Sequence, residues 1–169
     1  MNLWKDHLPD FEGYILQAKY ARMGGRAFTD SQRDAFAVAE RVAIRLALAD
    51  RVLISTPMWN FSVPYKLKQW FDVIIQPGLT FRFEPSQGYL PLLRDRPTIV
   101  ILASGGNYVT GMNRGWTDMA TPYLREALRF IGINDVRYVP IGPTTGPAEP
   151  IRIARESAHR RLAEMATSF

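Results

Sequence analysis

The stretch that decides the fold reads Val52-Leu53-Ile54-Ser55-Thr56, followed by Pro57-Met58-Trp59-Asn60-Phe61-Ser62-Val63-Pro64. Its first part is apolar and β-branched, which is typical of a strand that helices cover on both faces of a parallel sheet. Pro57 closes this strand. Pro64 suits the first turn of a helix, because the N–H that proline lacks would have no partner there. The stretch therefore predicts a strand, a loop and a helix.

Helices and strands are expected to alternate on both sides of this stretch. Upstream, Thr29 and Gln32 have the spacing of a capping box, which begins an amphipathic helix over residues 29–50. Downstream we expect a helix over 64–76, a small hairpin outside the main sheet at 80–83, a strand over 98–103, a helix over 123–131, a strand over 135–140 and a helix over 151–165. This order predicts an α/β fold with a doubly wound parallel sheet and helices on both faces.

The composition indicates one globular domain over residues 1–169 and a chemistry that comes from a bound group. The chain has 169 residues, of which 47% are hydrophobic and 22% charged. It has no cysteine, which excludes disulfides, thiolate nucleophiles and cysteine metal sites. His7 and His159 are far apart in the sequence, so we expect no metal site and no Ser-His-Asp triad. No side chain is assigned a catalytic role.

The charge pattern predicts no nucleic-acid or membrane partner. Lys and Arg number 21 against 16 Asp and Glu, a net charge of +5. The densest basic segments, residues 94–96 and 159–161, are interrupted or spaced along a helix, which is typical of a solvated surface. The apolar runs at 52–54 and 98–103 are too short to cross a bilayer. We expect a soluble, cytoplasmic protein.

Two loops follow neighbouring strands at the edge where parallel sheets bind ligands. In the loop at 57–64, Trp59 and Phe61 either cap the core or contact a planar ligand, and Asn60 either occupies a turn or binds the ligand's polar edge. In the loop at 103–108, Gly105 and Gly106 either form an ordinary turn or let the backbone approach a ligand closely. Because the two loops follow consecutive strands, they could face one cavity.

These residues carry a resemblance to a known family. Pro57-Met58-Trp59-Asn60-Phe61 matches a Pro-Met-Tyr-Asn-Phe segment that contacts flavin in the FMN-dependent NADH azoreductases, also called NADH:quinone oxidoreductases. These enzymes have a flavodoxin-like fold, and the chain resembles them along essentially its whole length, through residues 67–72, 80–83, 121–124 and 130–136. One motif departs from the pattern: residues 103–106 lie where the family usually has Ser-Arg-Gly-Gly, so a contact of that arginine is lost.

The resemblance implies a cofactor, substrates and site residues. It implies that NADH passes a hydride to FMN, and that a quinone or an azo compound then takes the electrons. It also implies a homodimer. Asn60, Phe83 and Phe130 match positions on the substrate side, although ordinary packing is an equal alternative for the two phenylalanines. The residues expected to contact the flavin ring are Met58, Trp59, Asn60 and Phe61 on one edge, and Ala103, Ser104, Gly105 and Gly106 on the other.

The beginning of the chain leaves alternatives open. Asn2-Leu3-Trp4 resembles the family's second strand, so we expect this chain to lack the family's first strand, phosphate-binding loop and helix, and to bind FMN weakly for that reason. Either the protein is longer or it is a truncated relative. The main alternative to the enzyme is a non-enzymatic remnant that retains surfaces for dimerisation or protein contact. A flavin-binding electron carrier is a third interpretation.

Overall fold

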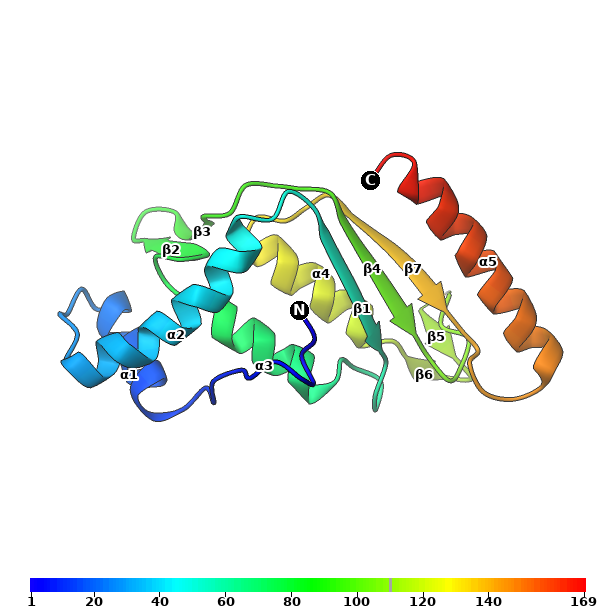
Figure 1. Ribbon diagram of the computed structural model, residues 1–169, viewed down its shortest axis with the longest axis horizontal. Coiled ribbons are helices and arrows are strands. Elements are labelled where there is room, and N and C mark those ends of the chain that lie inside the picture. The colour runs from blue at the N-terminus through cyan, green and yellow to red at the C-terminus, as the bar shows by residue number, and fades with distance from the viewer. Residues whose placement is uncertain (110) are drawn as a thin grey trace. The chain divides into compact units, whose positions relative to one another are not determined.

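The computed structural model of the protein describes residues 1–109 and 111–169 and divides into two compact units. The first unit consists of Met1–Ala49, Tyr65–Asp95 and Ala127–Asn134. The second consists of Asp50–Pro64, Arg96–Glu126 and Asp135–Phe169. Each unit is therefore assembled from three separate stretches of the chain, which can be followed by colour in Figure 1.

The second unit contains the three-stranded parallel sheet, with the order β1-β4-β7 (Figure 1). Its strands are β1 (Val52–Pro57), β4 (Thr98–Ala103) and β7 (Val136–Ile141). Val52 lies opposite Thr98, and Thr98 lies opposite Val136, so the strands start in line. The three predicted strands and their parallel arrangement are confirmed, with β7 shifted by one residue. Their carboxyl ends consequently lie at one edge of the sheet.

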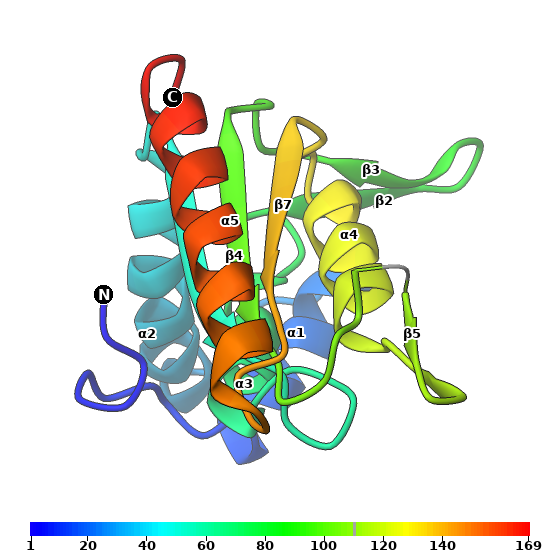
Figure 2. The ribbon, with the colours of Figure 1, turned by 90° about the vertical axis from the view of Figure 1, so that its right-hand side faces the viewer.

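Helix α5 (Ala148–Ala166) covers one face of this sheet (Figure 2). Ile99, Val139 and Ala158 form the buried centre of the contact. Ala158, Leu162 and Met165 recur at helical spacing, so they share the face of α5 that meets the strands. The strand residues in this contact belong to β4 and β7, and Leu53 on the neighbouring strand β1 is 59% exposed. The partly buried side chains packed around the centre are Ile101, Ile141, Leu162, Met165 and Phe169.

Two further elements of the second unit prepare the candidate site. A small hairpin of β5 (Met112–Asn113) and β6 (Trp116–Thr117) lies where we predicted only a polar loop. Helix α4 (Ala120–Phe130) follows it and continues into the first unit. There Gly132 has φ +105°, and its N–H donates to the carbonyl oxygen of Arg129 at 3.0 Å, as expected of the glycine that ends a helix.

The first unit contains three helices and a second hairpin. Its helices are α1 (Gly13–Met23), α2 (Asp30–Ala47) and α3 (Tyr65–Ile74). The predicted capping box is present at α2, because the Gln32 N–H donates to Thr29 Oγ1 at 3.3 Å and the Thr29 N–H donates to Gln32 Oε1 at 3.1 Å. The antiparallel pair β2 (Phe81–Glu84) and β3 (Gly88–Pro91) confirms the hairpin outside the main sheet.

The prediction of a strand at Asn2-Leu3-Trp4 is wrong, because these residues form a turn. The Asn2 carbonyl oxygen accepts from the N–H groups of Lys5 at 3.0 Å and Asp6 at 2.8 Å. The Asn2 side chain accepts from the Trp4 N–H at 3.0 Å. A short polar side chain that satisfies nearby backbone groups in this way favours a turn over a strand.

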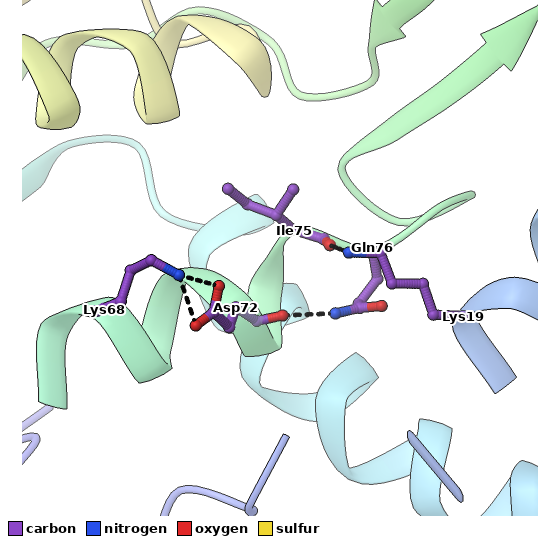
Figure 3. Close-up of polar contacts among 5 residues, drawn as sticks. All are labelled: Lys19, Lys68, Asp72, Ile75 and Gln76. Carbon is purple, nitrogen blue, oxygen red and sulfur yellow. Dashed lines mark hydrogen bonds and ion pairs between the residues drawn. The ribbon is translucent and has the colours of Figure 1, made fainter. Parts of the chain in front are cut away.

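Polar contacts join α1 to the end of α3 within the first unit (Figure 3). Gln76 is fully buried, and its Nε2 donates to the Asp72 carbonyl oxygen at 2.6 Å. Lys19 Nζ donates to the Ile75 carbonyl oxygen at 3.5 Å, and burial lowers the pKa of this amine while Asp72 acts in the opposite direction. The Asp72 carboxylate itself pairs with Lys68 at 2.6 Å. The end of α3 is thereby fixed by side chains as well as by Pro77 and Gly78.

Candidate functional site

The two predicted loops lie side by side at the carboxyl edge of the parallel sheet. Pro57 lies opposite Ala103 at the ends of β1 and β4, and the Met58 N–H donates to the Ala103 carbonyl oxygen at 2.6 Å. This bond holds Met58, the first residue after β1, against Ala103, the last residue of β4. The structure therefore brings the two loops that carry the eight expected flavin contacts to the same edge of the sheet.

Residues 59–62 form a tight two-residue turn that displays aromatic side chains. Trp59 and Ser62 exchange two backbone hydrogen bonds, of 2.9 and 3.0 Å, and between them Asn60 and Phe61 have φ of +47° and +69°. Positive φ at both central residues is the pattern of a type I′ turn. It suits asparagine, but it costs a residue such as phenylalanine about 1–2 kcal/mol. Trp59 and Phe61 are 47% and 41% exposed, and Asn60 is also exposed.

Phe61 is held in this conformation by two contacts from the β5–β6 region. Its ring stacks on the ring of Trp116, with centroids 5.4 Å apart and planes inclined by 18°. Its carbonyl oxygen accepts from the Met119 N–H at 2.9 Å. A stacked aromatic pair contributes about 0.5–1.5 kcal/mol beyond its buried area, a magnitude comparable to the backbone strain.

The second loop is built around Ser104, whose polar groups are all used within the protein. The Ser104 hydroxyl donates to the Gly106 carbonyl oxygen at 2.8 Å. The Ser104 carbonyl oxygen accepts from the N–H and the hydroxyl of Thr144. Thr145 Oγ1 donates to the Gly105 carbonyl oxygen at 3.1 Å. A third loop, at residues 142–146 after β7, therefore supports the second.

We did not predict this supporting role of the third loop. The available signal was its position, because Gly142 follows the third strand at the same sheet edge.

Gly105 and Gly106 have neighbours that restrict any larger side chain. A Cβ at Gly106 would lie 2.7 Å from Asn113 Cγ and 3.3 Å from the Tyr108 ring. A Cβ at Gly105 would lie 3.3 Å from Thr145 Oγ1. The loop thus presents backbone rather than side chains, as a loop that approaches a flat ligand closely requires.

A cavity of about 510 Å³ lies beside the second loop, within the second unit. Among its lining groups, the Asp118 carboxylate accepts from the N–H groups of Ala120 and Thr121 at 2.8 and 2.9 Å, so it serves the start of α4. The Tyr138 hydroxyl is buried and has no hydrogen-bond partner among the described residues. Burial raises the pKa of Tyr138, and Arg125 opposes this shift. Arg161 also lines this cavity, and its Nη2 donates to the Tyr138 carbonyl oxygen at 3.1 Å.

Phe83 and Phe130, predicted on the substrate side, lie in one aromatic cluster of the first unit. The Phe83 ring meets Tyr89 edge-on, with centroids 5.2 Å apart. The Phe130 ring contacts Tyr89 at 5.6 Å and Phe81 at 5.0 Å. Phe83 is 55% exposed, whereas Phe130 is half-buried. Phe130 is thus mainly a packing residue of this cluster, and Phe83 offers a free aromatic face.

The loops supply aromatic rings, amides and backbone, and they supply no acidic or basic side chain. Residues 57–64 and 103–108 contain no Asp, Glu, Lys, Arg or His. Within residues 1–109 and 111–169, no three His, Asp or Glu side chains gather closely enough to hold a metal ion. No helix over the same residues is long and apolar enough to cross a membrane. The arrangement suits a planar heteroaromatic ligand that brings its own reactivity.

Comparisons with known proteins agree with this geometry. Residues 1–165 match a family described by its flavodoxin-like fold. The chain is 73% identical over 169 residues to an FMN-dependent NADH:quinone oxidoreductase 1 of Bradyrhizobium diazoefficiens, covering all of this chain and 81% of that protein. It is 38% identical over 171 residues to an FMN-dependent NADH:quinone oxidoreductase of Nitratidesulfovibrio vulgaris, with the same two coverages.

Two solved structures have a similar backbone. An azoreductase from Bacillus anthracis superposes with a TM-score of 0.87 at 24% identity, over all of this chain and 80% of that one. An FMN-dependent NADH-azoreductase from Bacillus anthracis, in complex with FMN, superposes with a TM-score of 0.78 at 27% identity, over 98% of this chain and 80% of that one. The predicted flavodoxin-like fold is confirmed.

Proposed function

We propose that this chain is an FMN-dependent oxidoreductase that passes electrons from NADH to quinones or azo compounds. The chain belongs to the family described by its flavodoxin-like fold. The observation that carries this function is the 73% identity, over the whole chain, to a protein named for this activity. The site agrees with it, since the two loops offer what a flavin ring needs. No observation on the described residues favours the non-enzymatic remnant.

The residues of the first loop fit the flavin ring by their chemistry. Trp59 and Phe61 present exposed aromatic faces, and the exposed Asn60 amide between them can donate to and accept from the polar edge of the ring. Met58 is half-buried and contributes apolar surface, because its N–H is already used by Ala103. We assign these four residues to one side of the ring.

The residues of the second loop fit the ring by their lack of bulk. Gly105 and Gly106 present only backbone, and Ala103 is the small residue that leads into them. The Ser104 hydroxyl is engaged with Gly106, so Ser104 shapes the loop and does not reach the ring through that hydroxyl. We assign Ala103, Ser104, Gly105 and Gly106 to the other edge on these grounds.

Bound FMN supplies the redox chemistry, since its ring accepts a hydride from NADH and passes electrons on to the acceptor. The protein contributes orientation. The type I′ turn at Asn60 and Phe61 fixes where the amide and the aromatic ring point, and the bond between Met58 and Ala103 fixes the spacing of the two loops. Fixed donors cost no rearrangement when charge develops on the ring.

Several finer assignments belong to the same proposal. Asn60 and Phe83 contact the acceptor, and Phe130 supports Phe83 through Tyr89. NADH is the donor, the protein is a homodimer, and it works in the cytoplasm, where NADH is available. The resemblance to the azoreductase family supports the donor and the dimer, and light scattering on the purified protein measures the oligomeric state directly.

The test of this function is Asn60→Ala. The wild-type protein is expected to bind FMN weakly in a fluorescence titration and to oxidise NADH in the presence of a soluble benzoquinone. Loss of one amide hydrogen bond, worth about 1 kcal/mol, lowers kcat/KM about fivefold. The free energy of unfolding should fall by about 1 kcal/mol, because alanine tolerates φ +47° less well than asparagine does.

The matched control is Gln17→Ala, which removes an exposed amide from α1. This variant should keep the wild-type kcat/KM. A wild-type protein that neither binds FMN nor oxidises NADH contradicts the proposed function. An Asn60→Ala variant with unchanged kcat/KM contradicts only the role of Asn60.

A further inference from the structure

The β5–β6 hairpin contacts both candidate flavin loops, one through each of its strands. Trp116 of β6 stacks on Phe61 of the first loop. Asn113 of β5 lies so close to Gly106 of the second loop that a single added carbon there would meet its side chain. Asn113 and Trp116 are paired across the hairpin. In Figure 1 the hairpin lies near the carboxyl ends of the strands.

The hairpin itself is firmly connected to the second unit. Its turn residues Arg114 and Gly115 have φ of +48° and +87°, the values of a two-residue type I′ turn. At its base the Asp118 N–H donates to the Gly111 carbonyl oxygen at 2.9 Å. The Asp118 carboxylate accepts from the first two N–H groups of α4. The position of Trp116 is therefore linked to the start of helix α4.

The first loop needs such a support. Phe61 has a left-handed backbone that is unfavourable for a residue with a Cβ, and such a conformation persists only where neighbouring groups hold it. The neighbours that hold Phe61 are Trp116, through the ring stack, and Met119, through the backbone hydrogen bond. Without Trp116, rotation of Phe61 out of the left-handed region would change the direction of both Asn60 and Phe61.

We infer that the β5–β6 hairpin is a clamp that holds the two flavin loops in their orientation, with Trp116 as a positioning residue. Trp116 acts through Phe61. The ligand named here, a flavin ring, rests on the proposed function. The clamp is a property of the protein alone and can be measured without any ligand.

The first experiment measures amide hydrogen exchange in the ligand-free protein. Trp116→Ala should accelerate exchange at the N–H groups of Trp59, Ser62 and Met119 by about threefold to tenfold, because these three donate in the turn or to Phe61. Trp116→Leu, which keeps apolar surface but cannot stack, should do the same. The control is Trp4→Ala, since Trp4 is an exposed tryptophan that contacts Tyr65 in the first unit.

The second experiment titrates riboflavin, which has the flavin ring and no phosphate. Trp116→Ala should weaken riboflavin binding about threefold to tenfold, Trp116→Phe should restore most of it, and Trp4→Ala should leave it unchanged. Unchanged exchange in both Trp116→Ala and Trp116→Leu overturns the clamp. Faster exchange with unchanged riboflavin affinity overturns the positioning role of Trp116.

A double-mutant cycle separates support of the turn from direct contact with the ring. Glycine adopts positive φ without strain, so Phe61→Gly needs no support. In the Phe61→Gly background, Trp116→Ala should have no further effect on exchange at Trp59 and Ser62. A wild-type protein that binds no flavin contradicts the proposed function, and the exchange data then still decide whether the clamp exists.

Discussion

Two turns of the second unit have the same backbone pattern and different residues. The turn at Asn60 and Phe61 and the turn at Arg114 and Gly115 both have positive φ at their two central positions. The second turn places glycine where a side chain is unfavourable. The first turn places phenylalanine there and depends on Trp116 and Met119 to hold it.

The difference separates a position where the residue matches the backbone preference from one where it does not. At Gly115 nothing lies within 4 Å of an added Cβ, so the glycine serves the backbone alone. At Phe61 the aromatic ring is retained although glycine would relieve strain. Strained residues held by their neighbours are typical of functional sites. Three substitutions test this comparison.

The largest effect is expected for Gly115→Val. A β-branched residue at φ +87° is strongly unfavourable, so the free energy of unfolding should fall by about 2 kcal/mol. Because the position is open, this loss reflects backbone strain alone. Urea unfolding measures it. Gly115→Asn is the matched control, since asparagine tolerates the left-handed region, and its loss should be less than half as large. Equal losses in the two variants would contradict the strain explanation.

A smaller effect is expected for Phe61→Gly, compared with Phe83→Gly. Both remove an exposed, ring-paired phenylalanine, but only Phe61 has positive φ. Relief of strain should offset the lost stack at Phe61, whereas glycine within β2 adds an entropic cost. The free energy of unfolding measured in urea should therefore be about 1 kcal/mol higher for Phe61→Gly than for Phe83→Gly. A Phe61→Gly variant that loses as much stability as Phe83→Gly would show that the left-handed conformation is not strained.

The smallest effect is expected for Arg114→Asn. This change gives the β5–β6 hairpin an Asn-Gly turn, the strongest short signal for a type I′ hairpin. The free energy of unfolding should rise by about 0.5 kcal/mol, and thermal unfolding with calorimetry can resolve such a change. Arg82→Asn, on β2, is a control in which the same replacement meets no turn requirement. A gain in that control equal to the gain at Arg114 would point to charge instead of turn geometry.

The sheet could be predicted from the sequence because its signal is local. Residues 52–56 and 98–103 are apolar runs between helix-forming segments, and β1 and β4 lie there. Helix α1 has no comparable signal, since its buried residues are Ile15, Ala18 and Ala21, two of them small. The family resemblance predicts a strand at Asn2-Leu3-Trp4, but local hydrogen bonds hold these residues in a turn.

The candidate site also has parts that could be predicted from the sequence and parts that could not. The loop at Met58–Phe61 and the glycines at 105 and 106 lie in consecutive residues that resemble a family motif, so they could be proposed as flavin contacts before any contact was known. The support of Phe61 by Trp116 joins positions far apart in the sequence, and so does the support of Gly105 by Thr145. Such pairs leave no local pattern. They follow from the order of the strands and the hairpin between them.

The interleaving of the two units also determines how the chain can be made and divided. The first unit needs Ala127–Asn134, which lies beyond β1 and β4 of the second, and the second needs β7, which follows. No single cut of the chain separates the two units from each other. During synthesis, the first unit stays incomplete until residue 134 has been added, and the sheet until residue 141. Long-range pairing of this kind slows folding, because distant segments must meet before their contacts stabilise them. The apolar strands of the newly made chain are therefore exposed to aggregation until β7 has left the ribosome.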